Sequence, residues 1–295
     1  MSKNASENKS ENKVKARPPF LRALGRDEPP EQVTVQGRTY CRAVIYKHDS
    51  WAATCRYEAV TPAGEHDSII VKINRRQPVF FIPMKWVGRL FARREAAIYQ
   101  RVKDLAGELP GELPEGVPAF LGRLDATTVS HVFVPGEPLA PGDELSAEFM
   151  QQLRDLVAAF HERDIAIVDL QKCENILKGD DGRPYLMDFQ ISWMLPQNAV
   201  GKFPPLRWVH RIFVNSDDYH VLKHYYRFRR DLMTDAELRR IEHKPWPIRL
   251  HRAVVRYPQK LRRQLLVWLK IREPGGKATS ELNPERGVER RREGQ

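Results

Sequence analysis

The pattern of apolar and polar positions predicts a strand followed by a helix in the first half of the chain. Residues 69–73 form a β-branched run that is typical of a strand, and Lys72 stands inside it. Between residues 93 and 105, apolar positions recur every three or four residues, which predicts a helix with Glu95 near its start. A lysine inside a buried strand needs a partner. Taken singly, Lys72 also fits an edge-strand guard against aggregation, and Glu95 a solvated carboxylate at a helix start.

Two later apolar runs each end at an aspartate. Asp169 follows the run 165–168 and opens a polar loop that contains Asn175, and Asp188 follows the run 185–187. Carboxylate and amide oxygens are hard ligands that suit Mg²⁺, and a further carboxylate can deprotonate an acceptor hydroxyl. These are the groups that phosphoryl transfer from a nucleotide requires. The simpler alternative is a polar turn between two strands, in which Asn175 and Asp188 are ordinary turn residues.

The stretch 160–170, with the sequence Phe-His-Glu-Arg-Asp-Ile-Ala-Ile-Val-Asp-Leu, resembles the helix end and catalytic loop of the protein-kinase-like superfamily. The resemblance implies ATP and Mg²⁺ as cofactors. It also implies a role for each candidate residue: Asp169 is the catalytic carboxylate, Asn175 and Asp188 are metal ligands, and Lys72 paired with Glu95 binds the α- and β-phosphates. We further expect Lys172 to point at the γ-phosphate. Residues 132–139 resemble the hinge that joins the two lobes and contacts adenine.

Four departures from the superfamily pattern bear on activity. Ile167 and Val168 replace the usual His-Arg pair, and Gln190 replaces the glycine of Asp-Phe-Gly. The spacing from Asp169 to Asn175 is one residue longer than usual, so we expect a bulge at residues 171–173. The turn at residues 46–56 contains no glycine, although backbone N–H groups approach phosphates most easily through glycine. The missing glycines, the Ile167-Val168 pair and Gln190 favour a pseudokinase, which keeps the fold without the chemistry. The retention of all five candidate residues opposes it: Lys72, Glu95, Asp169, Asn175 and Asp188.

The resemblance implies an α+β, two-lobed protein-kinase-like fold with a small β-rich N-lobe and a mainly helical C-lobe. The first 17 residues are rich in Ser, Asn, Lys and Glu and lack apolar periodicity, which is typical of disorder. We divide the chain into a disordered N-terminal tail (1–30), the N-lobe (31–139), the C-lobe with basic helices (140–272) and a disordered C-terminal tail (273–295).

Basic residues and aromatics indicate a membrane surface as a partner. The net charge of +11 resides in residues 201–295, which contain 23 Lys and Arg residues against 11 Asp and Glu residues. Residues 249–270 are basic with apolar positions at helical spacing. Residues 79–94 combine Phe80, Phe81 and Trp86 with several cations, a composition that binds anionic bilayer interfaces. Both segments also fit helices that pack an apolar face on the lobes.

The sequence around Trp86, the Val-Pro-Gly-Glu hinge and the two aspartate loops is similar to the bacterial lipopolysaccharide core (Kdo/heptose) kinases and, more distantly, to RIO-type atypical kinases. This resemblance implies an ATP-dependent kinase that phosphorylates a glycolipid sugar or another hydroxyl acceptor. An atypical serine/threonine protein kinase is the alternative. From the sequence we expect neither a secretory signal nor a membrane span, and three scattered cysteines fit a reducing compartment. We expect a cytoplasmic protein, peripheral on the inner membrane, and do not expect nucleic acid as a partner.

Overall fold

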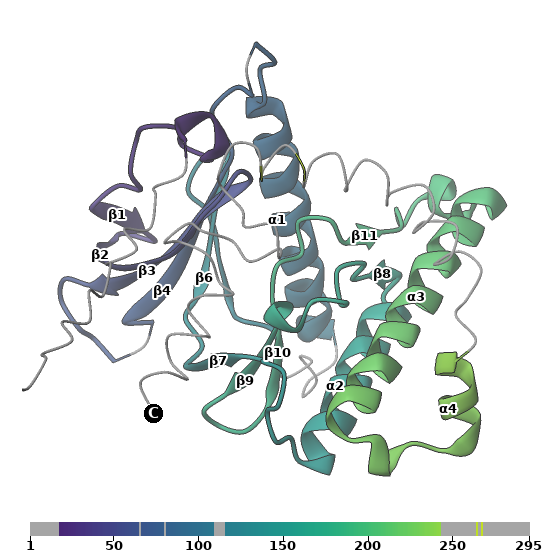
Figure 1. Ribbon diagram of the computed structural model, residues 1–295. Helices are drawn as coiled ribbons and strands as arrows, with labels where there is room; N and C mark the ends of the chain where they lie inside the picture. Colours follow the sequence, from purple (N-terminus) through teal and green to yellow (C-terminus); the bar gives the residue numbers. More distant parts are fainter. Residues whose placement is uncertain are drawn as a thin grey trace, which may run out of the picture.

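The structure is a computed structural model that describes residues 18–242, except Glu65, Phe80 and residues 109–115, together with the isolated positions 264 and 267. It has two lobes (Figure 1). One is a curved β-sheet covered by a long helix, and the other is mainly helical. The α+β, two-lobed fold expected from the sequence is therefore confirmed. Phe80, the tails at 1–17 and 273–295, and the proposed basic helices at 249–270 apart from positions 264 and 267 lie outside the described residues.

The N-lobe contains a six-stranded sheet in which neighbouring strands are antiparallel. Its strand order is β1-β2-β3-β4-β6-β5. The strands are β1 (Gln32–Val35), β2 (Arg38–His48), β3 (Ala52–Ala59), β4 (Ser68–Asn74), β5 (Phe120–Arg123) and β6 (Thr128–Val132). Almost every side chain of β4 is buried, because the strand lies between β3 and β6 with α1 near it. This central position explains the continuous β-branched run in the sequence.

Helix α1 (Lys85–Glu108) lies between the sheet and the helical lobe (Figure 1). It begins earlier than the helix expected from residue 93, so the aromatic and basic segment is its first part and not a link before it. Gly88 explains how this early start is accommodated. A Cβ atom at Gly88 would lie 2.1 Å from the carbonyl oxygen of Arg75, so only glycine allows this close approach of the helix to the end of β4.

The C-lobe combines two short sheets with three described helices. The strands are β7 (Gly136–Pro138), β8 (Ile165–Ala166), β9 (Ile176–Gly179), β10 (Pro184–Leu186) and β11 (Trp193–Met194). The helices are α2 (Ala147–Glu162), α3 (Pro204–Phe228) and α4 (Asp235–Glu242). Short 3₁₀ turns are η1 (Pro19–Leu21), η2 (Cys173–Asn175), η3 (Ala199–Lys202) and η4 (Arg230–Leu232). Helix α3 begins at Pro204, where the proline ring fixes a helical φ.

Local sequence explains the C-lobe core. The hydroxyl of Ser146 caps α2 by accepting the N–H of Phe149 at 3.0 Å. Apolar residues of α2 recur at helical spacing and are buried. One core cluster joins the lobes, because it contains Tyr99 from α1, Phe160 from α2 and Phe189 from the loop after β10.

Part of the expected N-terminal tail belongs to the N-lobe. Ala23 and Leu24 are buried, and the guanidinium of Arg75 donates to the carbonyl oxygens of Phe20 (2.8 Å) and Ser50 (2.5 Å). Arg75 is itself fully buried. The folded lobe thus starts before residue 31, because a buried arginine ties this segment to the β2–β3 turn.

Candidate active site

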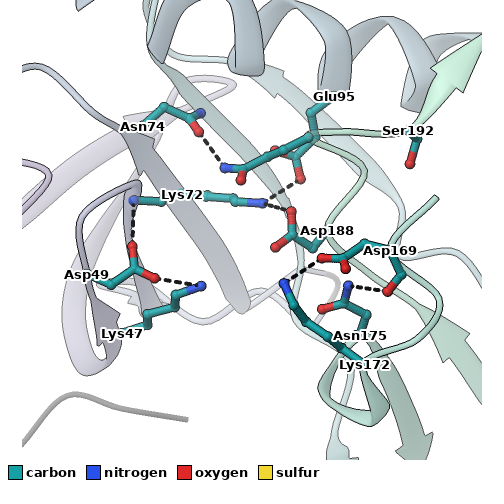
Figure 2. Close-up of polar contacts among 12 residues, drawn as sticks. Lys47, Asp49, Lys72, Asn74, Glu95, Asp169, Lys172, Asn175, Asp188 and Ser192 are labelled. Atoms are coloured by element: carbon teal, nitrogen blue, oxygen red, sulfur yellow. Dashed lines mark hydrogen bonds and ion pairs between the residues drawn. The ribbon is translucent and has the colours of Figure 1, made fainter. Parts of the chain in front are cut away.

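Lys72, Glu95 and Asp188 form a cluster of charges where β4, α1 and the loop after β10 meet (Figure 2). The Nζ atom of Lys72 lies 3.1 Å from Oε1 of Glu95 and 2.8 Å from Oδ1 of Asp188. Glu95 is almost completely buried, and Lys72 nearly so. Lys72 and Glu95, both predicted from the sequence, thus form an ion pair. Asp188 is a second partner of the same lysine.

Burial and charge act against each other in this cluster. Burial raises the pKa of Glu95. Burial alone would raise the pKa of Asp188 as well, but Lys72, and after it Lys47, outweigh that effect and lower the pKa to about 2. Burial would lower the pKa of Lys72, whereas Asp188 and Glu95 raise it. At neutral pH, Asp188 therefore carries a negative charge and Lys72 a positive one.

The backbone that carries Asp188 is held from two sides. Asp188 has a positive φ of 65°, a conformation that needs support in a residue other than glycine. The next side chain, Phe189, is fully buried and packs on the rings of Tyr99 and Phe160 at centroid distances of 5.2 and 5.3 Å. Gln190 then donates from Nε2 to Oδ1 of Asn74 in β4, at 2.5 Å. The glutamine that replaces the usual glycine thus links the loop to the strand that carries Lys72.

The catalytic loop places three of the predicted residues beside one another (Figure 2). Lys172 donates from Nζ to Oδ2 of Asp169 at 2.6 Å. Asn175 donates from Nδ2 to the backbone oxygen of Asp169 at 3.0 Å, so its amide oxygen faces away from that carbonyl. The loop contains a 3₁₀ turn, η2, at residues 173–175, and the bulge expected at 171–173 stays a prediction.

Asp217 on α3 holds the start of this loop, and the sequence analysis did not single it out. Its fully buried carboxylate accepts the backbone N–H groups of Ile167 at 2.7 Å and Val168 at 2.9 Å. Nε2 of His161 lies 3.3 Å from the same carboxylate. Val168 has a φ of 69°, which is strained for a β-branched residue. In the sequence, Asp217 is marked only as an acidic residue four positions before apolar residues of a helix. This pattern is too common to predict that the residue holds a loop.

In the turn between β2 and β3, an aspartate side chain accepts backbone hydrogen bonds. The side chain of Asp49 accepts the N–H groups of Trp51 at 2.7 Å and of Ala52 at 3.0 Å. Lys47 lies near the end of β2, with its Nζ 3.0 Å from Oδ2 of Asp49. The backbone donors of this turn therefore point at an internal acid.

The segment expected to be a hinge joins the two lobes. It runs from β6 in the N-lobe sheet to β7, which pairs with β9 in the C-lobe. Gly136 has a φ of 147°, and a Cβ atom there would lie 2.3 Å from the carbonyl oxygen of Lys178. This glycine is therefore required by the close packing of the two strands.

Comparisons with known proteins give distant structural matches. No protein-family model matches the chain, and no curated protein matches its sequence. Among solved structures, the Rio2 kinase–ADP/Mg²⁺–phosphoaspartate complex from Chaetomium thermophilum matches with a TM-score of 0.46 and 14% identity over 69% of this chain. The Rio2 kinase from the same organism matches with a TM-score of 0.43 and 15% identity over 67% of this chain. The matched region spans 58% of each Rio2 chain.

The structure itself shows the two-lobed α+β arrangement (Figure 1). Likeness at this level carries no information about activity, which must be argued from the site. Within the described residues, no group of three or more His, Cys, Asp or Glu side chains is arranged to hold a metal ion. No helix in the same part of the chain has the length and apolar character to cross a bilayer.

Proposed function

We propose that the protein is an ATP-dependent phosphotransferase that phosphorylates a hydroxyl group on the sugar of a membrane-associated glycolipid. The observation that carries the proposal is the position of Lys72, held between Glu95 and Asp188 by contacts of 3.1 and 2.8 Å. A buried lysine with two carboxylate partners is costly to assemble. An ammonium group that two carboxylates hold in a fixed position can bind phosphate, which explains why this arrangement is present.

The residues of the site fit Mg²⁺ and ATP. Asp188 is ionised at neutral pH because its pKa is lowered to about 2. The amide of Asn175 directs its nitrogen to the Asp169 carbonyl, which leaves its oxygen turned the other way. We assign Asp188 and Asn175 as metal ligands, Lys72 as the ligand of the α- and β-phosphates, and the hinge backbone as the adenine site. When bound, Mg-ATP supplies the phosphoryl group and the metal neutralises phosphate charge.

Asp169 is the residue that we assign to the acceptor. Its carboxylate orients the acceptor hydroxyl and takes its proton as the oxygen bonds to the γ-phosphorus. The bond from that phosphorus to the bridging oxygen breaks, and ADP leaves with the electron pair. The Nζ atom of Lys172 lies 2.6 Å from Oδ2 of Asp169. We assign this positively charged group as a ligand of the γ-phosphate.

The acceptor class is supported by the surface at the start of α1. Phe81, Ile82 and Trp86 are 99, 61 and 60% exposed, which is unusual for large apolar side chains grouped together. Lys85 and Arg89 lie beside them and are exposed. Aromatics with cations bind anionic bilayer interfaces. We therefore propose a cytoplasmic protein that binds peripherally to the inner membrane, where a glycolipid acceptor is within reach.

The decisive experiment measures the melting temperature with saturating Mg-ATP and turnover on a membrane-glycolipid extract. Wild type should be stabilised, because a ligand that binds only the native state at 100 times its Kd adds about 2.7 kcal/mol. Asp188→Ala should lose this metal-dependent gain. Asp169→Ala should keep the gain and lose turnover. Asp180→Ala, an exposed aspartate in the same lobe, is the control. The proposal fails if wild type shows no gain, or if both site variants transfer phosphate normally.

A second function is favoured by one observation. The carboxylate of Asp49 accepts backbone N–H groups of the β2–β3 turn. In a glycine-rich loop, the corresponding N–H groups would bind phosphate. Their loss is compatible with a pseudokinase that acts as a binding module. Nucleotide binding without turnover on any acceptor would support this alternative. Label found on protein serine or threonine, and not on glycolipid, would support the atypical protein kinase.

A further inference from the structure

A cavity of about 580 Å³ lies beside the catalytic loop, between α1 and the segment that follows Asp188. Its walls include Arg94 and Ala97 from α1, Val168 from the catalytic loop, Trp193 from β11 and Phe213 from α3. None of these residues belongs to the nucleotide site assigned above. The volume is in the range of pockets that hold small ligands.

The cavity borders the catalytic loop. Val168, which lies in its wall, immediately precedes Asp169 in the chain. The wall is aromatic on one side, where the rings of Trp193 and Phe213 meet edge-on at 5.0 Å. Arg94 donates to the carbonyl oxygen of Ser192 at 2.8 Å, which places its guanidinium at this wall and uses one of its five donors.

An exposed apolar stripe on α1 leads to the cavity. Trp86, Leu90 and Arg94 follow one another at intervals of four residues, so they lie on one face of the helix. Trp86 is 60% and Leu90 42% exposed, and the stripe continues at Ala97 in the cavity wall.

We propose that this cavity is the acceptor site and that it takes an anionic sugar head group of a glycolipid. The inference rests on the proposed phosphotransferase function and adds the place and charge of the acceptor. Aromatic and aliphatic walls suit the apolar face of a sugar ring. An arginine suits a carboxylate or phosphate on it, because its planar fork binds such groups at two points. The lipid remains in the bilayer against the stripe.

The test compares neighbouring arginines of α1, with purified lipopolysaccharide in detergent micelles as the acceptor. Arg94→Ala should raise KM for this acceptor about tenfold, the usual effect of losing a charged hydrogen-bond donor. Arg93→Ala, an exposed neighbour away from the cavity, should leave it unchanged. Arg94→Lys should restore part of the loss. Ala97→Phe, which fills the cavity, should also raise KM. All four variants should keep the melting-temperature gain with Mg-ATP.

The outcomes separate this inference from the proposed function. If wild type gains no stability from Mg-ATP, the phosphotransferase itself is wrong. If wild type phosphorylates lipopolysaccharide but Arg94→Ala and Ala97→Phe keep its KM, only the position of the acceptor site is wrong. If wild type binds Mg-ATP but transfers no phosphate to lipopolysaccharide, the glycolipid occupant is overturned.

The β2–β3 turn supports a second, independent inference. Asp49 occupies the N–H groups of Trp51 and Ala52, so these donors do not face a nucleotide. The same carboxylate holds Lys47, whose ammonium points into the space between Lys72 and Lys172 (Figure 2). The charge of Lys47 also contributes to the low pKa of Asp188. The site thus has the ammonium group of Lys47 beside the turn where the superfamily pattern has backbone donors.

We infer that Lys47 binds the nucleotide phosphates in place of a glycine-rich loop. Like the first inference, it presumes nucleotide binding but concerns how the phosphates are held. Lys47→Met should weaken ATP and ADP binding about tenfold, the usual effect of losing a charged contact. Binding of adenosine, which has no phosphate, should stay the same. Lys202→Met, at an exposed lysine of the C-lobe, is the control. Equal weakening of ATP and adenosine, or unchanged ATP affinity, would overturn the inference.

Discussion

The charge cluster and the catalytic loop, two parts of the same site, are held in place by different kinds of contact. The cluster of Lys72, Glu95 and Asp188 brings together opposite charges from a strand, a helix and a loop. The catalytic loop instead has an irregular backbone, with Val168 at a φ of 69°, and Asp217 holds it through two backbone N–H groups. The cluster depends on charged side chains that can be recognised in the sequence. The loop depends on Asp217, which is distant in the chain and accepts backbone N–H groups of the loop.

The largest effect should come from Asp217→Ala. The change leaves the N–H groups of Ile167 and Val168 buried without an acceptor, at about 1–3 kcal/mol each. We expect a loss of about 4 kcal/mol in the free energy of unfolding, measured by urea denaturation. Asp218→Ala, at the neighbouring half-exposed aspartate, should stay within about 0.5 kcal/mol. Similar losses in both variants would mean that the loop is not held in this way.

Lys72→Met tests the charge cluster. It removes the cation that contacts the buried carboxylates of Glu95 and Asp188, which typically costs about 3 kcal/mol. Adding Glu95→Gln should recover part of this loss, because it removes one of the two stranded charges. Denaturation of the single and double variants measures the recovery. If the double variant is no more stable than Lys72→Met alone, the loss arises from packing and not from charge.

The same comparison explains what the sequence could predict. The β-branched run around Lys72 is a local pattern, and the strand expected there is present as β4. The start of α1 was placed too late, because the aromatic and basic residues after residue 84 conceal the helical period. Asp217, Arg75 and the Asn74–Gln190 contact act across long sequence separations on backbone or amide groups. No local pattern marks them, so only the folded structure reveals them.

His131 provides a pH test of the sheet beside the charge cluster. Its side chain is buried in β6, paired with β4, and burial lowers its pKa from 6.5 to about 4. Between these values the unfolded chain binds a proton that the folded chain does not, so stability falls as pH falls. From pH 8 to pH 5 the loss should be about 2 kcal/mol. His131→Gln should lack this part of the pH dependence, as denaturation at both pH values would measure. Parallel profiles would contradict the prediction.

The contact between Gln190 and Asn74 joins the two regions, so it tests whether they are independent. Gln190→Ala leaves Oδ1 of Asn74 buried without this donor, and a lost neutral hydrogen bond of this kind costs about 1–2 kcal/mol. Gln197→Ala, at an exposed glutamine further along the chain, is the control. If the contact fixes Asp188 against β4, Gln190→Ala should also weaken Mg-ATP binding, although Gln190 is assigned no contact with the nucleotide. A double-mutant cycle with Asn74→Ala separates the effects, because the coupling energy isolates this pair. A coupling near zero would mean that Phe189 alone positions Asp188, and that the strand and the loop are held separately.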